Sequence, residues 1–413
     1  MSATATSLPG APLVGRYYLY LLAAFILVLP FAHTVALRLT LLALLAACAV
    51  AVRLREATPA LPLKWPLVAV ATISVLSIAW AVDPVSSFGE VKNEIVYTFL
   101  AFFSAFVLTR TRADFVFYTW IILGGFAVLV ILGCAAFELP GRWAHFGFQG
   151  GVGTYSTYLV TVMPWVLASL VLTRSQIARA VLLMLIAMAL YGGFLTANRA
   201  FFITMLVVVV TFAALAVPLF SLRLAKKLFV GMAVLAFLTG LIGLFLLVIE
   251  GKLGAADGLG ALVERTFVGD VRIGFWRDSI EAMRENLWFG VGFGRPSFGY
   301  AYPELRTSEY FWHAHNMFLN RLAQTGVVGL AALLFLLVAL VRQASALYAR
   351  HQTLELRVIG AAALALLLGV IVKNFTDDFF GRELALLTWT MIGIVLGYTV
   401  RHSAAHAERK EPS

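Results

Sequence analysis

Long apolar runs, separated by short polar or charged stretches, recur along the whole chain. A helix needs about 20 apolar residues to cross the hydrocarbon core of a bilayer, and on this measure the sequence predicts twelve transmembrane helices. The pattern therefore predicts an all-α polytopic membrane protein. The approximate spans are 17–32, 34–52, 64–82, 95–109, 113–137, 155–173, 178–197, 200–220, 228–249, 315–341, 358–376 and 384–400.

Composition supports the same class. Hydrophobic residues make up 62% of the 413 residues and charged residues 13%, and mean hydropathy is +0.92, which is too apolar for one water-soluble globule of this length. Both cysteines, Cys48 and Cys134, lie in predicted helices, so we expect neither a disulfide framework nor a thiolate metal site. The net charge of +10 comes from scattered residues and not from a basic block, which argues against nucleic acid as a partner.

The connecting loops predict an orientation. Alternate loops and both termini hold 17 of the 31 Lys and Arg residues, and short basic loops stay in the cytoplasm. We therefore expect both termini to be cytoplasmic and the other set of loops, on the outer face, to carry the chemistry. The predicted organisation is as follows: 1–249, nine transmembrane helices; 250–314, a large outer segment; 315–400, three transmembrane helices; 401–413, a cytoplasmic tail.

Several arginines are predicted on the outer face, against the orientation rule. Any one of them could reach lipid headgroups or pair with an acid, but Arg199 separates two apolar runs with almost no loop, where a charge is expensive. Together they could bind an anion with two or more negative groups, and a lipid diphosphate is the natural anion at that depth. No Asp-rich metal motif accompanies them, so we expect no metal or cofactor, with arginine replacing the cation at the leaving group. The four arginines are Arg142, Arg199, Arg265 and Arg272.

The outer segment contains one predicted amphipathic helix. Its apolar face would comprise Trp276, Ile280, Met283 and Leu287, and the helix would lie along the surface or cover the bundle. The glycine-rich stretch 290–294 lacks the strand and helix that a dinucleotide loop needs. We interpret it as a flexible turn that lets the segment fold back over a cavity.

The tenth predicted span begins with polar side chains. Asn316, Asn320 and Gln324 recur every four residues, so they form one stripe that must face protein or water, not lipid. His315 opens the stripe at the outer boundary and could take a proton from a hydroxyl; His313 is the alternative base. Two glycines further along predict the close approach of a neighbouring helix: Gly326 and Gly329.

These features together resemble the O-antigen ligase (WaaL) family and its superfamily of O-antigen polymerases and bacterial protein oligosaccharyltransferases. The family motif of Arg, three residues and Leu resembles Arg199 to Ile203, with Ile for Leu. The His motif with a downstream Gly resembles His315, Asn316 and Gly326, and a loop pattern of Arg, Trp and Gly-x-Gly resembles Arg272, Trp276 and Gly290 to Gly292. The resemblance covers nearly the whole chain as topology.

The resemblance implies a glycosyltransferase C type fold and a metal-independent, inverting transfer of a glycan from undecaprenyl diphosphate at the periplasmic face of a bacterial inner membrane. It implies that Arg199, Arg265 and Arg272 hold the diphosphate and that His315 is the base. Arg142 is included on the physical argument alone. The residues expected to contact substrate are Arg142, His313, Asn316, Asn320 and Trp276.

Five functions are weighed after this comparison. We favour ligation to a lipid A core hydroxyl, because the chain has one dominant outer loop and no added C-terminal domain. An O-antigen polymerase or a protein oligosaccharyltransferase would use the same donor with another acceptor. An anion or lipid transporter is disfavoured because the charged candidates cluster at one face and no interrupted helices recur in matching positions of two halves. A structural scaffold would leave the arginines and the long outer segment unexplained.

Overall fold

The computed structural model describes residues 14–139, 142–143, 151–220, 224–253, 271–305, 313–350, 353–376 and 382–408. Within these residues, nine helices are long and apolar enough to cross a membrane and three shorter apolar helices accompany them. Each predicted span falls on a helix, which confirms the all-α polytopic class. The long elements are α1 (Val14–Val28), α2 (Val35–Arg55), α3 (Lys64–Leu76), α5 (Tyr97–Leu108), α6 (Arg112–Ala136), α7 (Val152–Leu172), α8 (Gln176–Leu195), α9 (Arg199–Ala216), α10 (Leu224–Leu253), α14 (Met317–Arg350), α15 (Leu354–Lys373) and α16 (Arg382–Glu408).

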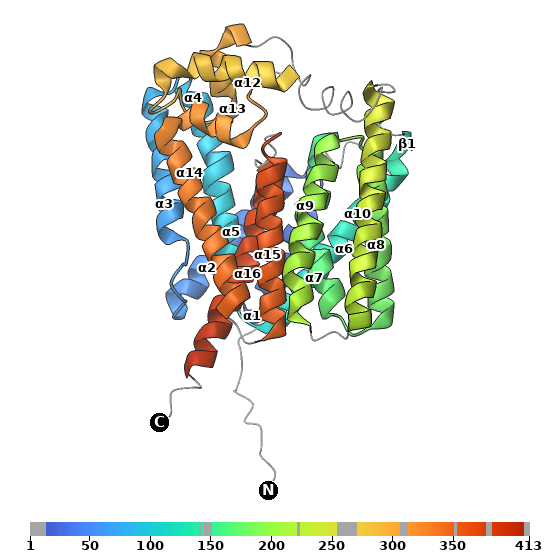
Figure 1. The fold of residues 1–413 in the computed structure, drawn as a ribbon. Helices are drawn as coiled ribbons and strands as arrows, with labels where there is room; N and C mark the ends of the chain where they lie inside the picture. The colour runs from blue at the N-terminus through green and yellow to red at the C-terminus, as the bar shows by residue number, and fades with distance from the viewer. Residues whose placement is uncertain are drawn as a thin grey trace.

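The shorter elements lie mainly between the long helices and over one end of the bundle (Figure 1). The two strands pair antiparallel as a small ribbon after α6. Asp83 caps α4 by accepting hydrogen bonds from the backbone N–H groups of Val85 and Ser86 at 3.1 and 3.0 Å, as helix N-caps commonly do. These elements are η1 (Ser77–Trp80), α4 (Pro84–Glu90), η2 (Val91–Val96), β1 (Phe137–Leu139), β2 (Arg142–Trp143), η3 (Val217–Leu219), α12 (Val271–Ala282), η5 (Met283–Asn286), α13 (Arg295–Ala301) and η6 (Pro303–Leu305).

The long helices run alternately up and down, which gives the bundle two distinct ends (Figure 1). We call the end covered by α12 and α13 the capped end. The opposite end, where α1 begins and α16 finishes, is the basic end. The ribbon of β1 and β2 and the first turns of α9 and α14 lie at the capped end. Helices α12 and α13 thus lie at the end opposite to that where α1 begins and α16 finishes.

Arginines at the basic end bind the ends of neighbouring helices. Arg110 forms an ion pair with Glu56, and Arg112 pairs with Glu355 at 2.8 Å. The Arg401 guanidinium donates to the backbone carbonyl of Phe106 at 2.8 Å. Since α helices end in unpaired carbonyls, a cation there is well placed.

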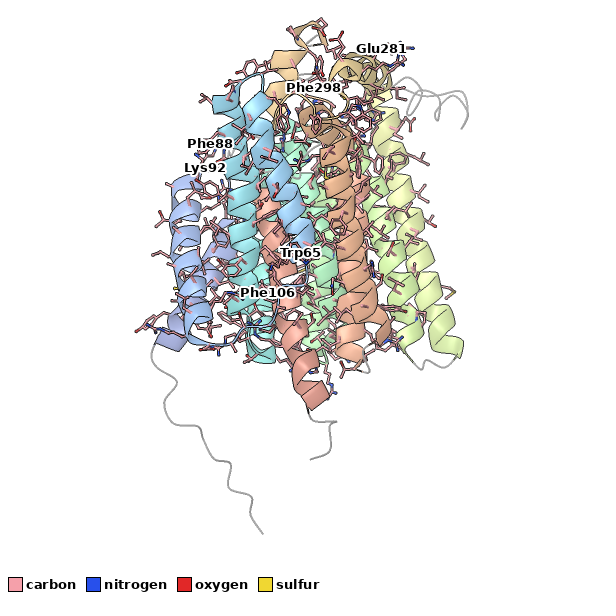
Figure 2. The ribbon with its side chains drawn as sticks, turned by 90° about the vertical axis from the view of Figure 1, so that its left-hand side faces the viewer. Trp65, Phe88, Lys92, Phe106, Glu281 and Phe298 are labelled. Carbon is pink, nitrogen blue, oxygen red and sulfur yellow. The ribbon has the colours of Figure 1, made fainter. Side chains whose placement is uncertain are left out.

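The core includes a close contact between α5 and α16. A Cβ added at Gly393 would lie 2.6 Å from the carbonyl oxygen of Phe102, and one added at Gly397 would lie 2.6 Å from that of Phe106. Glycines four residues apart allow two helix backbones to approach in this way, and membrane helices use this spacing often. Figure 2 shows Phe106 deep in the bundle, where it is fully buried.

The cap has its own hydrophobic cluster, which corrects the predicted face of the amphipathic helix. Phe275 and Met283 are buried, whereas Ile280 and Leu287 are 46% and 39% exposed. Within α12 the buried face runs through Phe275 and Ser279, four residues apart, so Ile280 lies beside that face. After Ala282 the chain continues as a 3₁₀ turn, which changes the rotation per residue before Leu287. Figure 2 shows Phe298 inside this cap and Glu281 at its outer edge.

The α14 helix is interrupted at Gly326, whose φ is +64°. The turn after η5 pairs with this break, because the N–H groups of Val291 and Gly292 donate to the carbonyls of Ala323 and Gln324 at 2.9 and 3.0 Å, and Val327 N–H donates to Leu287 at 2.8 Å. The backbone groups freed by the break are thereby satisfied inside the bundle, as a membrane requires.

Two sequence interpretations change here. The glycines of 290–294 form a turn that is closely packed against α14: a Cβ at Gly290 would lie 2.5 Å from the carbonyl oxygen of Ala323. Gly326 does permit a close approach, but the neighbour is the backbone of Trp288 in this turn and not a helix. Gly329 faces the side chain of Thr325 in its own helix. The sequence spacing alone could not distinguish these neighbours.

We expect Gly326→Ala to destabilise the protein by more than about 2 kcal/mol. A left-handed conformation costs an L-residue about 1–2 kcal/mol, and the added Cβ would lie 2.2 Å from the Trp288 carbonyl carbon. Gly240→Ala in α10 is the matched control, because nothing lies within 4 Å of its Cβ position, and alanine favours a helix over glycine. Thermal unfolding in detergent micelles measures both; equal midpoints would contradict the packing described.

Candidate functional site

The polar turn His313–Asn316 joins the cap to α14 at the capped end. His315 has a φ of +45°, which a residue with a Cβ rarely adopts. The backbone N–H of His315 donates to Nδ1 of His313 at 3.1 Å, and the two imidazole rings lie 4.0 Å apart between centroids. Strained backbone of this kind persists where surrounding contacts fix it and is common at functional sites.

Asn316 fixes the turn to two helices. Its Oδ1 accepts from the N–H groups of Phe318 and Leu319 at 2.9 and 3.1 Å, so it is the N-cap of α14. Its Nδ2 donates to the carbonyl of Phe375, after the end of α15, at 2.9 Å. Met317 N–H donates to the carbonyl of Asn374 at 2.9 Å. The start of α14 is therefore bound to the end of α15.

Asn320 and Trp276 hold the turn from two other sides. Oδ1 of Asn320 accepts from the N–H of Ala314 at 2.8 Å, and its Nδ2 lies 3.3 Å from Nδ1 of His313. Nε1 of Trp276, in α12, donates to the carbonyl of Ala314 at 2.7 Å. The structure thus brings together five predicted site residues: His313, His315, Asn316, Asn320 and Trp276.

The contacts of His313 separate the roles of the two histidines. Because Nδ1 of His313 accepts the His315 N–H, the neutral ring carries its proton on Nε2 and has no free acceptor nitrogen. His313 is also buried, with 4% of its surface exposed, whereas His315 is partly exposed. The geometry therefore favours His315 as the base and His313 as the residue that orients it.

The polar stripe of α14 faces protein, as the sequence predicts. Asn316, Asn320 and Gln324 are all buried. Asn320 and Gln324 line a small cavity with Glu94 and Arg321. The Oε1 atom of Gln324 is buried without a hydrogen-bond partner in the described part of the chain, so this cavity offers an acceptor to a polar guest.

Several charged residues near this cavity had no functional interpretation from sequence. Glu94 lies in the π-helical segment η2 and pairs with Arg295 at 3.7 Å; π-helical turns often mark functional sites but have no simple sequence signal. The Arg321 guanidinium lies 4.6 Å from the Phe293 ring centroid. Lys373, the last residue of α15, is fully buried. A single lysine inside an apolar run is the sequence feature that could have identified it as a candidate.

Arg199 begins α9 after a tight turn. Ala197 has a φ of +48°, and Asn198 caps the helix by accepting the N–H of Ala200 at 3.0 Å. The Nδ2 of Asn198 donates to Ser156 Oγ in α7 at 3.0 Å. These contacts fix the direction in which the chain enters α9. Arg199 is partly buried at this position, and the Asn before it was a capping signal that our sequence analysis missed.

The other predicted arginines lie on separate elements. Arg272 is in the first turn of α12 and is partly buried, and Arg142 belongs to β2. Arg265 lies outside the described residues. Arg142, Arg199 and Arg272 are all placed at the capped end by their elements (Figure 1). Convergence of their side chains around one ligand stays a prediction.

The surroundings of this site include a buried phenol and few metal-binding groups. Burial raises the pKa of the Tyr302 hydroxyl, in the cap beside Phe298, so it remains a neutral phenol. In the residues the structure describes, no three His, Cys, Asp or Glu side chains gather as a metal site would require.

Substitutions at Asn316 should separate its two contacts. Asn316→Asp keeps the acceptor for the first N–H groups of α14 and loses the donor to Phe375, whereas Asn316→Ala loses both. We expect Asn316→Ala to be about 1 kcal/mol less stable than Asn316→Asp, the usual value of an N-cap. Thermal unfolding of the two purified variants measures the difference, and equal stability would argue against the capping role.

Fold and site define a multi-pass membrane protein with a polar, histidine-containing turn held at one end of its bundle. Residues 159–334, which include Arg199, Arg272 and the turn, match the family described as O-antigen ligase. This match supports membership of the O-antigen ligase family and agrees with the resemblance found in the sequence. None of the curated proteins compared matches the chain. The match also supports a glycan-transferring function of the O-antigen ligase type.

Proposed function

We propose that this protein transfers an O-antigen glycan from undecaprenyl diphosphate to a sugar hydroxyl of the lipid A core, with inversion and without a metal. The family match supports the transferase class. The single observation that carries the proposed site is the turn of His313–Asn316, which is held from α12, α14 and the end of α15 and leaves His315 partly exposed.

In this proposal His315 accepts the proton of the acceptor hydroxyl. The hydroxyl oxygen attacks the anomeric carbon of the donor, a new C–O bond forms, and the bond to the diphosphate breaks on the opposite face. General-base assistance of this kind contributes about 10²-fold to 10⁴-fold in rate. His313, Asn320 and Trp276 act as positioning residues, because their polar groups are used to fix the turn.

Arg199, Arg265 and Arg272 would bind the diphosphate, and Arg142 would extend the same cationic surface. As the anomeric bond breaks, its electron pair stays on the diphosphate oxygen, so one further negative charge develops on the leaving group. Guanidinium groups that are already in place stabilise this charge more in the transition state than in the bound donor. Arg199 begins α9 and Arg272 lies in the first turn of α12, both at the capped end, where the turn that contains His315 leads into α14.

We further propose that the capped end is periplasmic and that both termini are cytoplasmic in the bacterial inner membrane. Support comes from the basic residues at the opposite end, such as Arg110, Arg112 and Arg401. Under this arrangement the predicted organisation 1–249, 250–314, 315–400 and 401–413 describes nine helices, a periplasmic segment, three helices and a tail. Membrane-impermeant labelling of single cysteines placed at Glu281 and at Arg357 should modify only the first in intact spheroplasts.

An assay with purified protein tests the reaction. The lipid-linked donor is offered with lipid A core, with a second lipid-linked glycan, or with an acceptor protein, and products are separated by gel and mass spectrometry. We expect a glycan–core product. A lengthened lipid-linked glycan would identify a polymerase, a glycoprotein would identify an oligosaccharyltransferase, and either result without the core product would overturn the proposed acceptor.

A further inference from the structure

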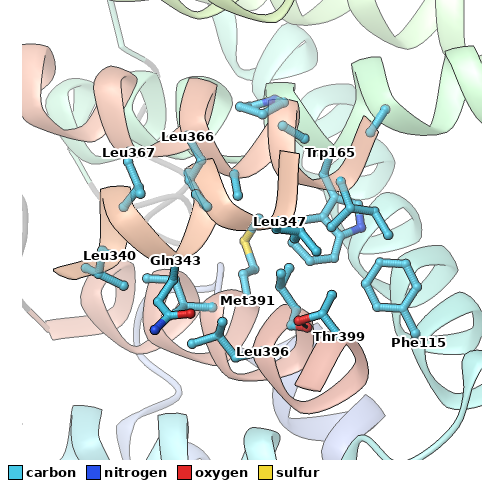
Figure 3. A pocket seen from close by; sticks show the side chains of 18 of the residues that line it. Phe115, Trp165, Leu340, Gln343, Leu347, Leu366, Leu367, Met391, Leu396 and Thr399 are labelled. Atoms are coloured by element: carbon cyan, nitrogen blue, oxygen red, sulfur yellow. Dashed lines mark hydrogen bonds between the residues drawn. The ribbon is translucent and has the colours of Figure 1, made fainter. Parts of the chain in front are cut away.

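One cavity with an almost wholly apolar lining does not include any residue of the histidine turn. It has a volume of about 300 Å³ and is surrounded by α6, α7, α14, α15 and α16 (Figure 3). Its lining is almost wholly apolar and includes Trp165, Leu347, Leu366 and Met391. Two lining residues locate the cavity along the bundle: Phe115 lies near the start of α6, and Thr399 lies near the end of α16. The cavity therefore occupies the half of the bundle at the basic end.

A second, more polar pocket adjoins this cavity. Phe115, Thr119, Ser169 and Leu172 line both. The second pocket is also lined by the indole of Trp120, half of whose surface is exposed. The charged residues that line the second pocket are three arginines and one acid: Arg112, Arg174, Arg179 and Glu355.

The charges at this opening are mainly positive. Arg112 is paired with Glu355 at 2.8 Å, which neutralises one cation. The Nε of Arg179 donates to the carbonyl of Thr173 at 3.1 Å, which orients that guanidinium, and Arg174 is exposed. Two cations thus remain uncompensated by the acid in the pocket. Guanidinium groups suit phosphate oxygens.

The two pockets together fit an amphipathic guest. Water in the inner cavity would have almost no polar partners, so it is poorly suited to that space. A hydrocarbon chain from the surrounding bilayer carries no such penalty. An anionic headgroup attached to that chain would reach the arginines at the boundary, where basic pockets between membrane helices commonly bind acidic lipids.

We propose that the cavity binds one acyl chain of an anionic phospholipid from the leaflet at the basic end, with its phosphate against Arg174 and Arg179. The bound lipid fills the space between α14, α15 and α16 and is distinct from the glycan donor proposed at the capped end. Its recognition depends on two separable contacts: the apolar cavity for the chain and the two arginines for the headgroup.

Brominated lipids test the proposal through Trp165, because bromine quenches a nearby indole. The full-length protein is placed in nanodiscs of phosphatidylcholine with brominated phosphatidylglycerol, or with the same fraction of brominated phosphatidylcholine. Subtracting Trp165→Phe isolates the Trp165 signal. We expect brominated phosphatidylglycerol to quench that signal several-fold more than brominated phosphatidylcholine.

Variants separate the two contacts. Arg174→Gln with Arg179→Gln should abolish the preference between the two lipids. Ala344→Leu or Ala363→Leu, which fill the cavity, should reduce quenching to the bulk level, whereas Ala331→Leu on the exposed side of α14 should not. Native mass spectrometry of retained lipids gives a second readout that needs no Trp165 substitution.

Three outcomes would overturn the proposal. The first is equal quenching by the two lipids in the wild-type protein. The second is undiminished quenching in both cavity-filling variants that remain folded. The third is displacement of phosphatidylglycerol by undecaprenyl phosphate at equimolar amounts, which would identify a polyprenyl chain as the occupant. None of these measurements depends on glycan transfer.

Discussion

His315→Ala is expected to lower the ligation rate by about 10²-fold to 10⁴-fold, the range for loss of a general base. The protein should stay folded, because Asn316, Asn320 and Trp276 hold the backbone of the turn. Donor binding should be nearly unchanged, since the imidazole acts on the acceptor. The measurements are initial rates of glycan–core formation and equilibrium binding of the lipid-linked donor.

His33→Ala is a matched control for this substitution. His33 also has a positive φ, +61°, but it is exposed in the loop between α1 and α2. Both variants therefore replace a histidine with alanine in a left-handed backbone conformation. We expect His33→Ala to ligate at the wild-type rate. If His315→Ala also retains that rate, His315 is not the base.

Arg199→Ala is expected to lower turnover by about 10²-fold to 10³-fold, the usual effect of removing one group that stabilises charge in a transition state. Arg199→Lys should recover only part of this loss, because lysine keeps the charge but cannot form the paired hydrogen bonds of guanidinium. The rate should fall more than donor affinity, since the charge grows as the leaving group departs.

Arginines on α12 provide the control for general charge effects. Arg277 is 84% exposed in its side chain, whereas Arg272 in the first turn of the same helix is partly buried. We expect Arg277→Ala to leave turnover unchanged and Arg272→Ala to lower it as Arg199→Ala does. Equal effects of the two α12 variants would mean that overall charge, and not a defined diphosphate site, determines the rate.

The bundle was predictable because hydrophobic spans are long and the bilayer fixes their length. Each predicted span falls on a helix, and the buried stripe of Asn316, Asn320 and Gln324 follows from spacing alone. Polar side chains at every fourth position cannot face lipid. The direction in which the stripe faces could therefore be predicted from local periodicity, without knowing which helices lie next to it.

Contacts between distant segments were not predictable in this way. The break in α14 at Gly326 is completed by Val291 and Gly292 of the cap, and a single glycine does not identify such a partner. Asn316 and Asn320 were expected to contact substrate, which stays a prediction, and the structure shows that their amides also hold the turn through Phe375 and Ala314. The sequence spacing does not identify these partners, because they lie on other segments of the chain.

The site arginines illustrate the same limit. Arg199 was singled out because a charge between two apolar runs is costly, and the structure places it at the start of α9 after the cap formed by Asn198. Which side chains it meets depends on segments that are remote in sequence. Hydropathy assigns these arginines to one end of the bundle but cannot set the distance between their guanidinium groups.

A map of the protein in nanodiscs with a bound, non-transferable analogue of the lipid-linked donor tests the central claim most directly. The proposal predicts density for the diphosphate at the capped end, in contact with the guanidinium groups of Arg199 and Arg272, with the His315 imidazole facing the anomeric carbon. Diphosphate density at the basic end, beside Arg174 and Arg179, would contradict it.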